Sequence, residues 1–274
     1  MKVLNRISDP QKKQAYTMKI ISYFTLFILI FFTGCAALQK TSDFAFGNKI
    51  GFPDDVDSSL FKEYPVAEVP LTNQRINGAD FGPYSIKLIR NEIKVEDNSS
   101  KGFLKSEFQK IASEKYNYEL KGIGKTVWRG ECTTSAHNIE KKSGFPMFEK
   151  REYSYKNIMA CNASGPDRII SLQMESLLPE NGGLCQQKGY AVSGNIRLDI
   201  EETMNTDKQY LMPVYIGFYI YNKGILAAVV QNRMKGAVYI SSTLDAELLP
   251  VVINTAAALL TYYDLLYEVG IDEE

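Results

Sequence analysis

The sequence predicts a mainly β fold: about ten antiparallel strands that form a barrel or a strongly curved sheet, followed by one buried C-terminal helix. Apolar residues recur at every second position in most segments after Pro83, which is the period of a strand. Turn-forming glycine and asparagine residues separate these segments. The chain from about residue 245 to 267 is instead apolar all round at helical spacing, as in a buried helix.

The first predicted strand begins after Pro83. Tyr84, Ile86 and Leu88 share one face, and the apolar positions then change parity, which predicts a bulge near Leu88. The next strands are expected at about 116–122, 125–139, 151–163 and 168–178.

The longest clean alternation runs from residue 188 to 203, where apolar and polar residues take turns without a break. We expect one strand there with a buried and a wet face, as in antiparallel sheets. Asn222-Lys223-Gly224 then predicts a hairpin between strands at 212–221 and 225–232, and a last strand follows at 237–242. Since these last strands are apolar on both faces, we expect them to be covered on both sides.

The helix expected at about 245–267 contains no turn signal after Pro250. Asn254 and Asp264 argue against a membrane-spanning helix. The pattern therefore predicts a helix wrapped by sheet.

This order of elements over about residues 84–267 resembles the tubby-like superfamily, in which a closed barrel surrounds such a helix. The resemblance rests on the order of elements and not on a residue motif. Some members bind phosphoinositides through basic surface residues, but no position of this chain matches those residues, so lipid binding is not carried over. The alternative is a generic antiparallel sheet packed on one face by the helix.

The N-terminal region has the layout of a secretory signal. Lys19 precedes the apolar run 20–32, which is shorter than the roughly 20 residues that a membrane-spanning helix needs. Phe32-Thr33-Gly34-Cys35 resembles the lipobox of bacterial lipoproteins, which implies acylation of Cys35 and cleavage before it. Because residues 1–17 make an unusually long charged beginning, we expect translation to start at Met18.

The chain is therefore expected to have three parts: a signal peptide (1–34), a lipidated tether with little regular structure (35–83) and a single β-rich domain (84–274). Some aromatic residues of the tether are expected to dock onto the domain. The resemblance implies a palmitate-type anchor in the cell envelope. In many double-membrane bacteria Ala36 after the cysteine favours sorting to the outer membrane.

Charge argues against a nucleic-acid partner. Removing residues 1–34 takes five basic residues and one acidic residue from the 31 Lys and Arg and 32 Asp and Glu, which leaves a net charge of −5. The sequence has no block of five or six basic residues to match a phosphate backbone.

Three cysteines remain when Cys35 carries lipid. If residues 125–163 form a hairpin that turns near residues 143–146, Cys132 and Cys161 face each other across it and form a disulfide. A bridge that uses Cys185 and two buried free thiols are the alternatives. The spacing of the cysteines offers no metal site, and no motif predicts a cofactor.

Candidate functional residues are few. His137, the only histidine, falls on the polar side of its strand, where we expect no catalytic role. Glu201 and Glu202 point to opposite faces and cannot act as a pair by themselves. Tyr215, Tyr219 and Tyr221 form an aromatic stripe, which is either a recognition surface or a face packed beneath the tether.

These observations predict a lipid-anchored envelope protein that acts as a non-enzymatic binding or assembly module on an envelope protein, a lipid or a glycan. The alternative is a periplasmic hydrolase whose carboxylates or hydroxyls come from distant strands.

Overall fold

A computed structural model gives the fold of the described part of the chain. The described residues are 50–66, 76–102, 105–144, 150–177, 186–203, 217–232 and 236–269. The mainly β fold with a C-terminal helix is confirmed, and the sheet holds thirteen strands rather than about ten. Cys35, Cys185 and Tyr215 lie outside the described residues.

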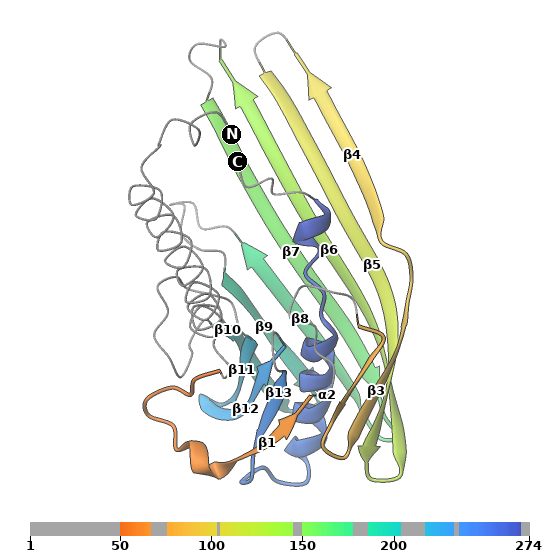
Figure 1. Ribbon diagram of the computed structural model, residues 1–274, viewed down its shortest axis with the longest axis vertical. Helices are drawn as coiled ribbons and strands as arrows, with labels where there is room; N and C mark the ends of the chain where they lie inside the picture. The colour runs from red at the N-terminus through yellow and green to blue at the C-terminus, as the bar shows by residue number, and fades with distance from the viewer. Residues whose placement is uncertain are drawn as a thin grey trace, which may run out of the picture. The chain divides into compact units, whose positions relative to one another are not determined.

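The strands follow one another round the sheet almost in chain order (Figure 1). The path runs β1-β13-β12-β11-β10-β9-β8-β7-β6-β5-β3-β2, and β4 pairs with β5. At the two ends of the path, Val66 and Phe81 form an antiparallel bridge, so the sheet is nearly closed into a barrel. The strands are β1 (Phe61–Pro65), β2 (Gly78–Phe81), β3 (Tyr84–Arg90), β4 (Lys94–Lys101), β5 (Lys105–Ile123), β6 (Thr126–Ser143), β7 (Lys150–Ser164), β8 (Ile169–Leu177), β9 (Gln186–Ser193), β10 (Ile196–Thr203), β11 (Gly217–Asn222), β12 (Ile225–Gln231) and β13 (Ala237–Ser241).

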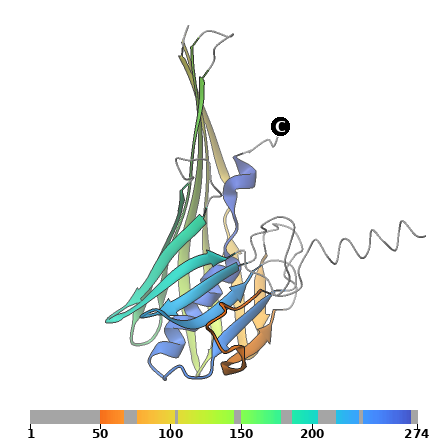
Figure 2. The same cartoon turned by 90° about the vertical axis from the view of Figure 1, so that its left-hand side faces the viewer.

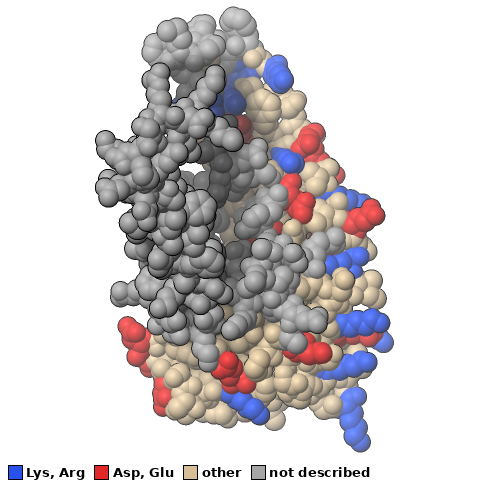
Figure 3. All heavy atoms as spheres, in the orientation of Figure 1, with Lys and Arg blue, Asp and Glu red and all other residues tan. Residues whose placement is uncertain are grey.

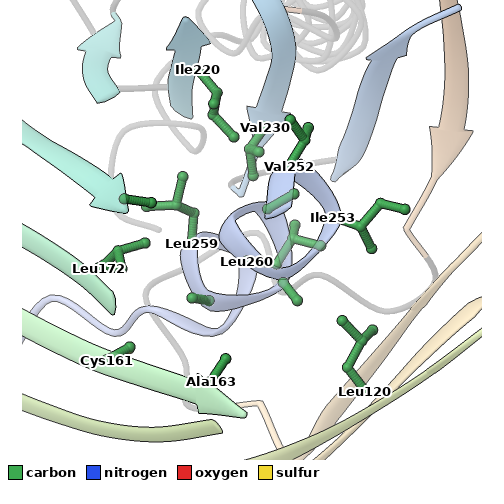
Figure 4. Packing of buried hydrophobic residues seen from close by; sticks show 14 of the residues in the cluster. Leu120, Cys161, Ala163, Leu172, Ile220, Val230, Val252, Ile253, Leu259 and Leu260 are labelled. Atoms are coloured by element: carbon green, nitrogen blue, oxygen red, sulfur yellow. The ribbon is translucent and has the colours of Figure 1, made fainter. Parts of the chain in front are cut away.

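Helix α2 (Leu248–Thr261) lies inside this nearly closed sheet, and every residue from 251 to 261 is buried. Leu120, Leu172 and Ile220 approach it from different strands (Figure 4). A helix with apolar residues all round must bury its whole circumference, and a surrounding sheet does so.

The two ends of α2 explain why it is shorter than the expected 245–267. Asp245 Oδ1 accepts hydrogen bonds from the backbone N–H groups of Glu247 and Leu248, at 3.0 and 2.7 Å, and so satisfies free donors of the first turn. At the other end Tyr262 is extended, with φ −63° and ψ 128°. A short 3₁₀ turn, η3 (Leu265–Glu268), follows.

The alternation at 188–203 forms two strands, β9 and β10, and not one. A two-residue turn with Gly194 at φ 57° separates Ser193 from Ile196, which pair with each other. Pairing across this turn places Ala191 opposite Leu198 inside the barrel, and Val192 opposite Arg197 on the outer face. The sequence pattern ran unbroken through the turn and so concealed it.

Two further predictions were wrong. Residues 61–65 and 78–81 belong to the segment expected to have little regular structure, yet they form β1 and β2 of the sheet, and β1 follows the 3₁₀ turn η2 (Ser58–Leu60). The expected bulge near Leu88 is instead a break after Arg90, between β3 and β4. Both strands pair with the same edge of β5, and the Asn91 N–H bonds to the Lys115 carbonyl at the junction, at 3.0 Å.

Beyond β3 the sheet continues as a four-stranded blade. We define the blade as β4 with residues 105–113 of β5, 135–143 of β6 and 150–158 of β7. Figure 2 shows it edge on, with the chain after α2 against one face. There Leu265 and Val269 pack on Ala112 and Ala136, so the end of the chain ties the base of the blade to the barrel.

Candidate binding surface

Cys132 on β6 lies directly opposite Cys161 on β7, and their Sγ atoms are 2.08 Å apart, as in a disulfide. The hairpin register is the one from which the pairing was predicted: Gly130 pairs with Ala163 and His137 with Lys156. Both cysteines are buried, 0% and 3% exposed. This pair therefore cross-links two strands of the barrel and presents no thiol at the surface.

A buried ion pair closes the C-terminal end of α2. Arg90 Nη1 lies 2.9 Å from Glu114 Oε2, Arg90 Nε donates to the Ile76 carbonyl at 3.0 Å, and Arg90 Nη2 donates to the Thr261 carbonyl. The last carbonyls of a helix lack intrahelical donors and carry partial negative charge, so a guanidinium there stabilises the helix. The guanidinium also lies over the Tyr116 ring, 4.4 Å from its centroid.

Two polar residues in one row of the sheet, Asn157 and Gln187, hold the chain after α2. Asn157, Ser176 and Gln187 are neighbours on β7, β8 and β9. Asn157 Nδ2 donates to the Tyr262 hydroxyl and, at 2.8 Å, to Asp264 Oδ1; Gln187 Nε2 donates to the same hydroxyl at 3.1 Å. These contacts fix the extended segment that leaves the barrel. Sequence patterns missed these contacts because they form only when distant strands meet the helix.

Tyr219 and Tyr221 of the predicted tyrosine stripe lie beneath the segment that precedes β1. Tyr219 is 7% exposed and its hydroxyl donates to the Gly51 carbonyl at 2.7 Å. Tyr221 is half-buried beside it, where burial, with Glu201 adding to it, raises the pKa of Tyr221 to about 12. Phe52 packs on the edge of the Tyr239 ring, with centroids 5.4 Å apart. Residues 50–61 therefore cover this face of β11–β13.

Each of the other residues considered for chemistry contacts a different partner. His137 is half-buried on β6, opposite Lys156. Glu201 forms an exposed ion pair with Lys188 at 3.6 Å, and Glu202 accepts a hydrogen bond from the Gln187 N–H. Within the described residues no group of three or more His, Cys, Asp or Glu side chains is arranged to hold a metal ion.

Two open depressions lie on the outer wall of the barrel. One, of about 470 Å³, is crossed by the Lys156 and Glu175 ion pair, whose charged atoms are 2.6 Å apart. The other, of about 460 Å³, is bordered by Ile89 and Ile169, which are 62% and 64% exposed. Neither is a deep pocket with converging acids.

The blade presents an exposed surface outside the barrel wall. Every residue of β4 is exposed. Among the described residues, β4 pairs only with β5, so its other edge presents backbone donors and acceptors. On the face toward α2 one row crosses all four strands: Ser99, Phe108, Glu140 and Tyr153.

Most of this surface could not be predicted, because β4 and residues 105–115 of β5 are too polar to show the strand period. One signal was present. The strand predicted at 125–139 pairs across the turn at Gly124 with the strand before it. Its far end, at residue 139, therefore needs a pairing partner at about residue 109. The structure carries this hairpin further, to Lys105 and Ser143.

Among the described residues, no helix has the length and apolar character needed to cross a membrane. No protein-family model, no curated protein and no solved structure matches the chain.

Proposed function

We propose that this protein is a lipid-anchored, non-enzymatic binding module of the bacterial cell envelope. Its anchor is the acylated Cys35, and its binding surface is the blade. The barrel and its enclosed helix form the rigid base that carries this surface.

The observation that carries the proposal is that α2 occupies the inside of the barrel. Leu259, Ala256 and Val252 are fully buried between opposite walls, so the interior is packed core rather than ligand space. At its mouth, Arg90 bonds to the Thr261 carbonyl and Asn157 bonds to Asp264 in the chain that follows the helix. Recognition is thereby assigned to an outer surface.

The blade is the outer surface with features of a binding site. Tyr153 is 56% exposed, and Lys142 Nζ lies 5.3 Å from the centroid of the Phe108 ring on the same face. Exposed aromatic side chains such as tyrosine are enriched at surfaces that bind partners. The lysines at both ends of β4, Lys94 and Lys101, protect its open edge from pairing with another copy of itself.

The lipobox-like sequence Phe32-Thr33-Gly34-Cys35 supports the anchor, with the outer membrane as the favoured location. We also propose a relationship to the tubby-like superfamily. It is supported by a nearly closed antiparallel sheet that surrounds a C-terminal helix, and it brings no ligand with it.

The anchor is tested by the mass and location of the mature protein in cells. We expect the N-terminal residue to be Cys35 with acyl chains, and Cys35→Ala to lose both the acyl mass and the membrane fractionation. Cys185→Ala is the matched control, because it removes a cysteine outside the lipobox. An unmodified Cys35 in the wild type would overturn the anchor.

The binding surface is tested by placing a photo-crosslinking amino acid at single positions in living cells. Ser99 and Tyr153 on the blade are expected to give crosslinks to an envelope component, and Lys125, an exposed residue in the turn at the opposite end of β5, is expected to give none. Equal crosslinking from Lys125, or none from the blade, would contradict the assignment.

A further inference from the structure

The two hairpins of the blade turn at the same end, and basic residues gather there. Lys101 pairs with Ser106 at the end of β4 and β5, and Ser143 pairs with both Lys105 and Lys150 at the end of the neighbouring strands. We name the last three rows of these strands, with the residues that follow them, the basic tip. It consists of residues 100–102, 105–107, 141–144 and 150–152.

The basic tip reverses the charge of the rest of the protein. It holds six basic side chains and only two acids, Glu107 and Glu152, whereas the chain as a whole carries more acidic than basic groups. The basic residues are Lys101, Lys105, Lys141, Lys142, Lys150 and Arg151. Three of these lysines lie in ion pairs with Glu107, Glu140 and Glu152, so the basic tip together with Glu140 keeps an excess of three positive charges. Figure 3 shows Lys and Arg atoms at the upper end of the described surface.

The basic tip was invisible as a sequence block because its charges come from four strands. No stretch of the chain holds five basic residues together, yet the register brings six into three adjacent rows. Pairing across the sheet therefore creates a charge density that the linear sequence lacks.

Aromatic residues lie next to the basic tip. Phe108 and Tyr153 occupy the next row of the blade, and Lys142 lies over the Phe108 ring. Aromatic side chains beside lysines are the combination that settles at the headgroup level of a bilayer.

We propose that the basic tip docks on the anionic headgroups of the bilayer that holds the lipid anchor. The proposal rests on the proposed function, since Cys35 supplies the anchor. Cys35 precedes the first described residue, Ile50, by 15 residues, which span at most about 50 Å when fully extended. A chain this short holds the domain at high effective concentration near the bilayer. Acyl chains and a basic patch together give the two signals that stable membrane attachment uses.

Docking is tested by quenching of a single added tryptophan. The full chain with Tyr153→Trp is purified and placed on vesicles that contain brominated phosphatidylglycerol, and on vesicles of brominated phosphatidylcholine alone. Trp128, the natural tryptophan, is 2% exposed inside the barrel and gives the unquenched baseline in the parent protein. We expect quenching of the added tryptophan only on the anionic vesicles, and its loss as the salt concentration rises.

Charge reversal identifies the residues responsible. Lys101→Glu/Lys105→Glu in the Tyr153→Trp chain is expected to lower the ratio of docked to undocked protein by at least about fivefold for each lysine removed. Lys121→Glu/Lys125→Glu, at the opposite end of β5, is the matched control and is expected to keep full quenching. Both pairs of lysines are exposed, so neither variant disturbs the core.

Quenching of equal strength on phosphatidylcholine, or quenching that survives Lys101→Glu/Lys105→Glu, would overturn the docking proposal. An unacylated Cys35 in the mass spectrum of the same sample would overturn the anchor instead. The assay still reports docking in that case, because unanchored protein can be added to excess vesicles.

Discussion

Arg90 and Glu114 form an ion pair inside the protein, with Nη1 and Oε2 2.9 Å apart and side chains only 4% and 0% exposed. β3 and β5, which carry them, are adjacent in the sheet, and the same guanidinium bonds the Thr261 carbonyl at the end of α2. The pair therefore links the barrel wall to the helix that it encloses.

Removing one partner of this pair leaves a buried charge without its counterion. We expect Glu114→Gln to lower the free energy of unfolding by about 3 to 5 kcal/mol, measured by urea denaturation. Arg90→Met/Glu114→Leu, which removes both charges, is expected to recover part of that loss. The control is Glu119→Gln, which breaks the exposed pair with Arg129 and is expected to cost less than about 1 kcal/mol. A loss of less than about 1 kcal/mol for Glu114→Gln as well would contradict the stabilising role of the buried pair.

The disulfide between Cys132 and Cys161 is shielded from solvent. Cys132→Ala/Cys161→Ala is expected to lower the free energy of unfolding by about 2 to 4 kcal/mol, because the unfolded chain gains freedom. In the folded protein, reductant alone is expected to leave this disulfide intact. Reductant together with urea is expected to expose the two additional thiols of Cys132 and Cys161. Thiol counting followed by peptide mapping checks both statements. A peptide that joins Cys161 to Cys185 would contradict the pairing.

Burial of Tyr116 makes stability sensitive to high pH. Burial raises the pKa of Tyr116 to about 12, against the opposing effect of the Arg90 charge, while the ordinary value for the unfolded chain is 10.0. Below pH 10 both states keep the proton. Between about pH 10 and 12 only the unfolded state loses it, so stability falls by about 1.4 kcal/mol per pH unit for this residue.

Tyr116→Phe removes this titration. We expect the variant to lose stability less steeply above pH 10 than the parent protein, when urea denaturation is measured at a series of pH values. The comparison of the two proteins at pH 7 gives the baseline cost of the substitution. If the free energy of unfolding fell equally steeply in both proteins above pH 10, the pKa of Tyr116 would be the same in the folded and unfolded chain, which would contradict the prediction.

Residues 50–61 are held on the outer face of the sheet by specific contacts. Tyr219→Phe removes the hydrogen bond to the Gly51 carbonyl and is expected to cost about 1 kcal/mol locally. Hydrogen exchange should become faster at Ile50, whose N–H bonds Gln231 Oε1, while α2 stays protected. The control is Tyr153→Phe on the blade, which is expected to leave exchange at Ile50 unchanged. Equal exchange in the two variants would contradict this role of Tyr219.

Sequence periodicity predicted the elements whose two faces differ in polarity. Residues 170, 172 and 174 of β8 were assigned to one face and are all buried. The pairing of Cys132 with Cys161 followed from one more assumption, the position of the hairpin turn. Both features are local or depend on a single turn, which is why a single sequence was enough.

The features that were missed have no periodic signal. β4 is exposed along its whole length, so no alternation marks it. The turn at Gly194 was missed because the alternation on one side happened to be in phase with that on the other. The polar contacts of Asn157 with Tyr262 and Asp264 join positions more than a hundred residues apart, and no pattern within either segment predicts them.

The enclosed helix has a consequence for the timing of folding. β1, from residues 61–65, closes the barrel against β13, from residues 237–241, while α2, which follows β13 in the chain, sits inside. The innermost element is thus synthesised after every described strand of the wall, and the wall must stay open until the helix is in place. Contacts between such distant parts of a chain form slowly. The barrel can therefore close round its core only after α2 has been synthesised.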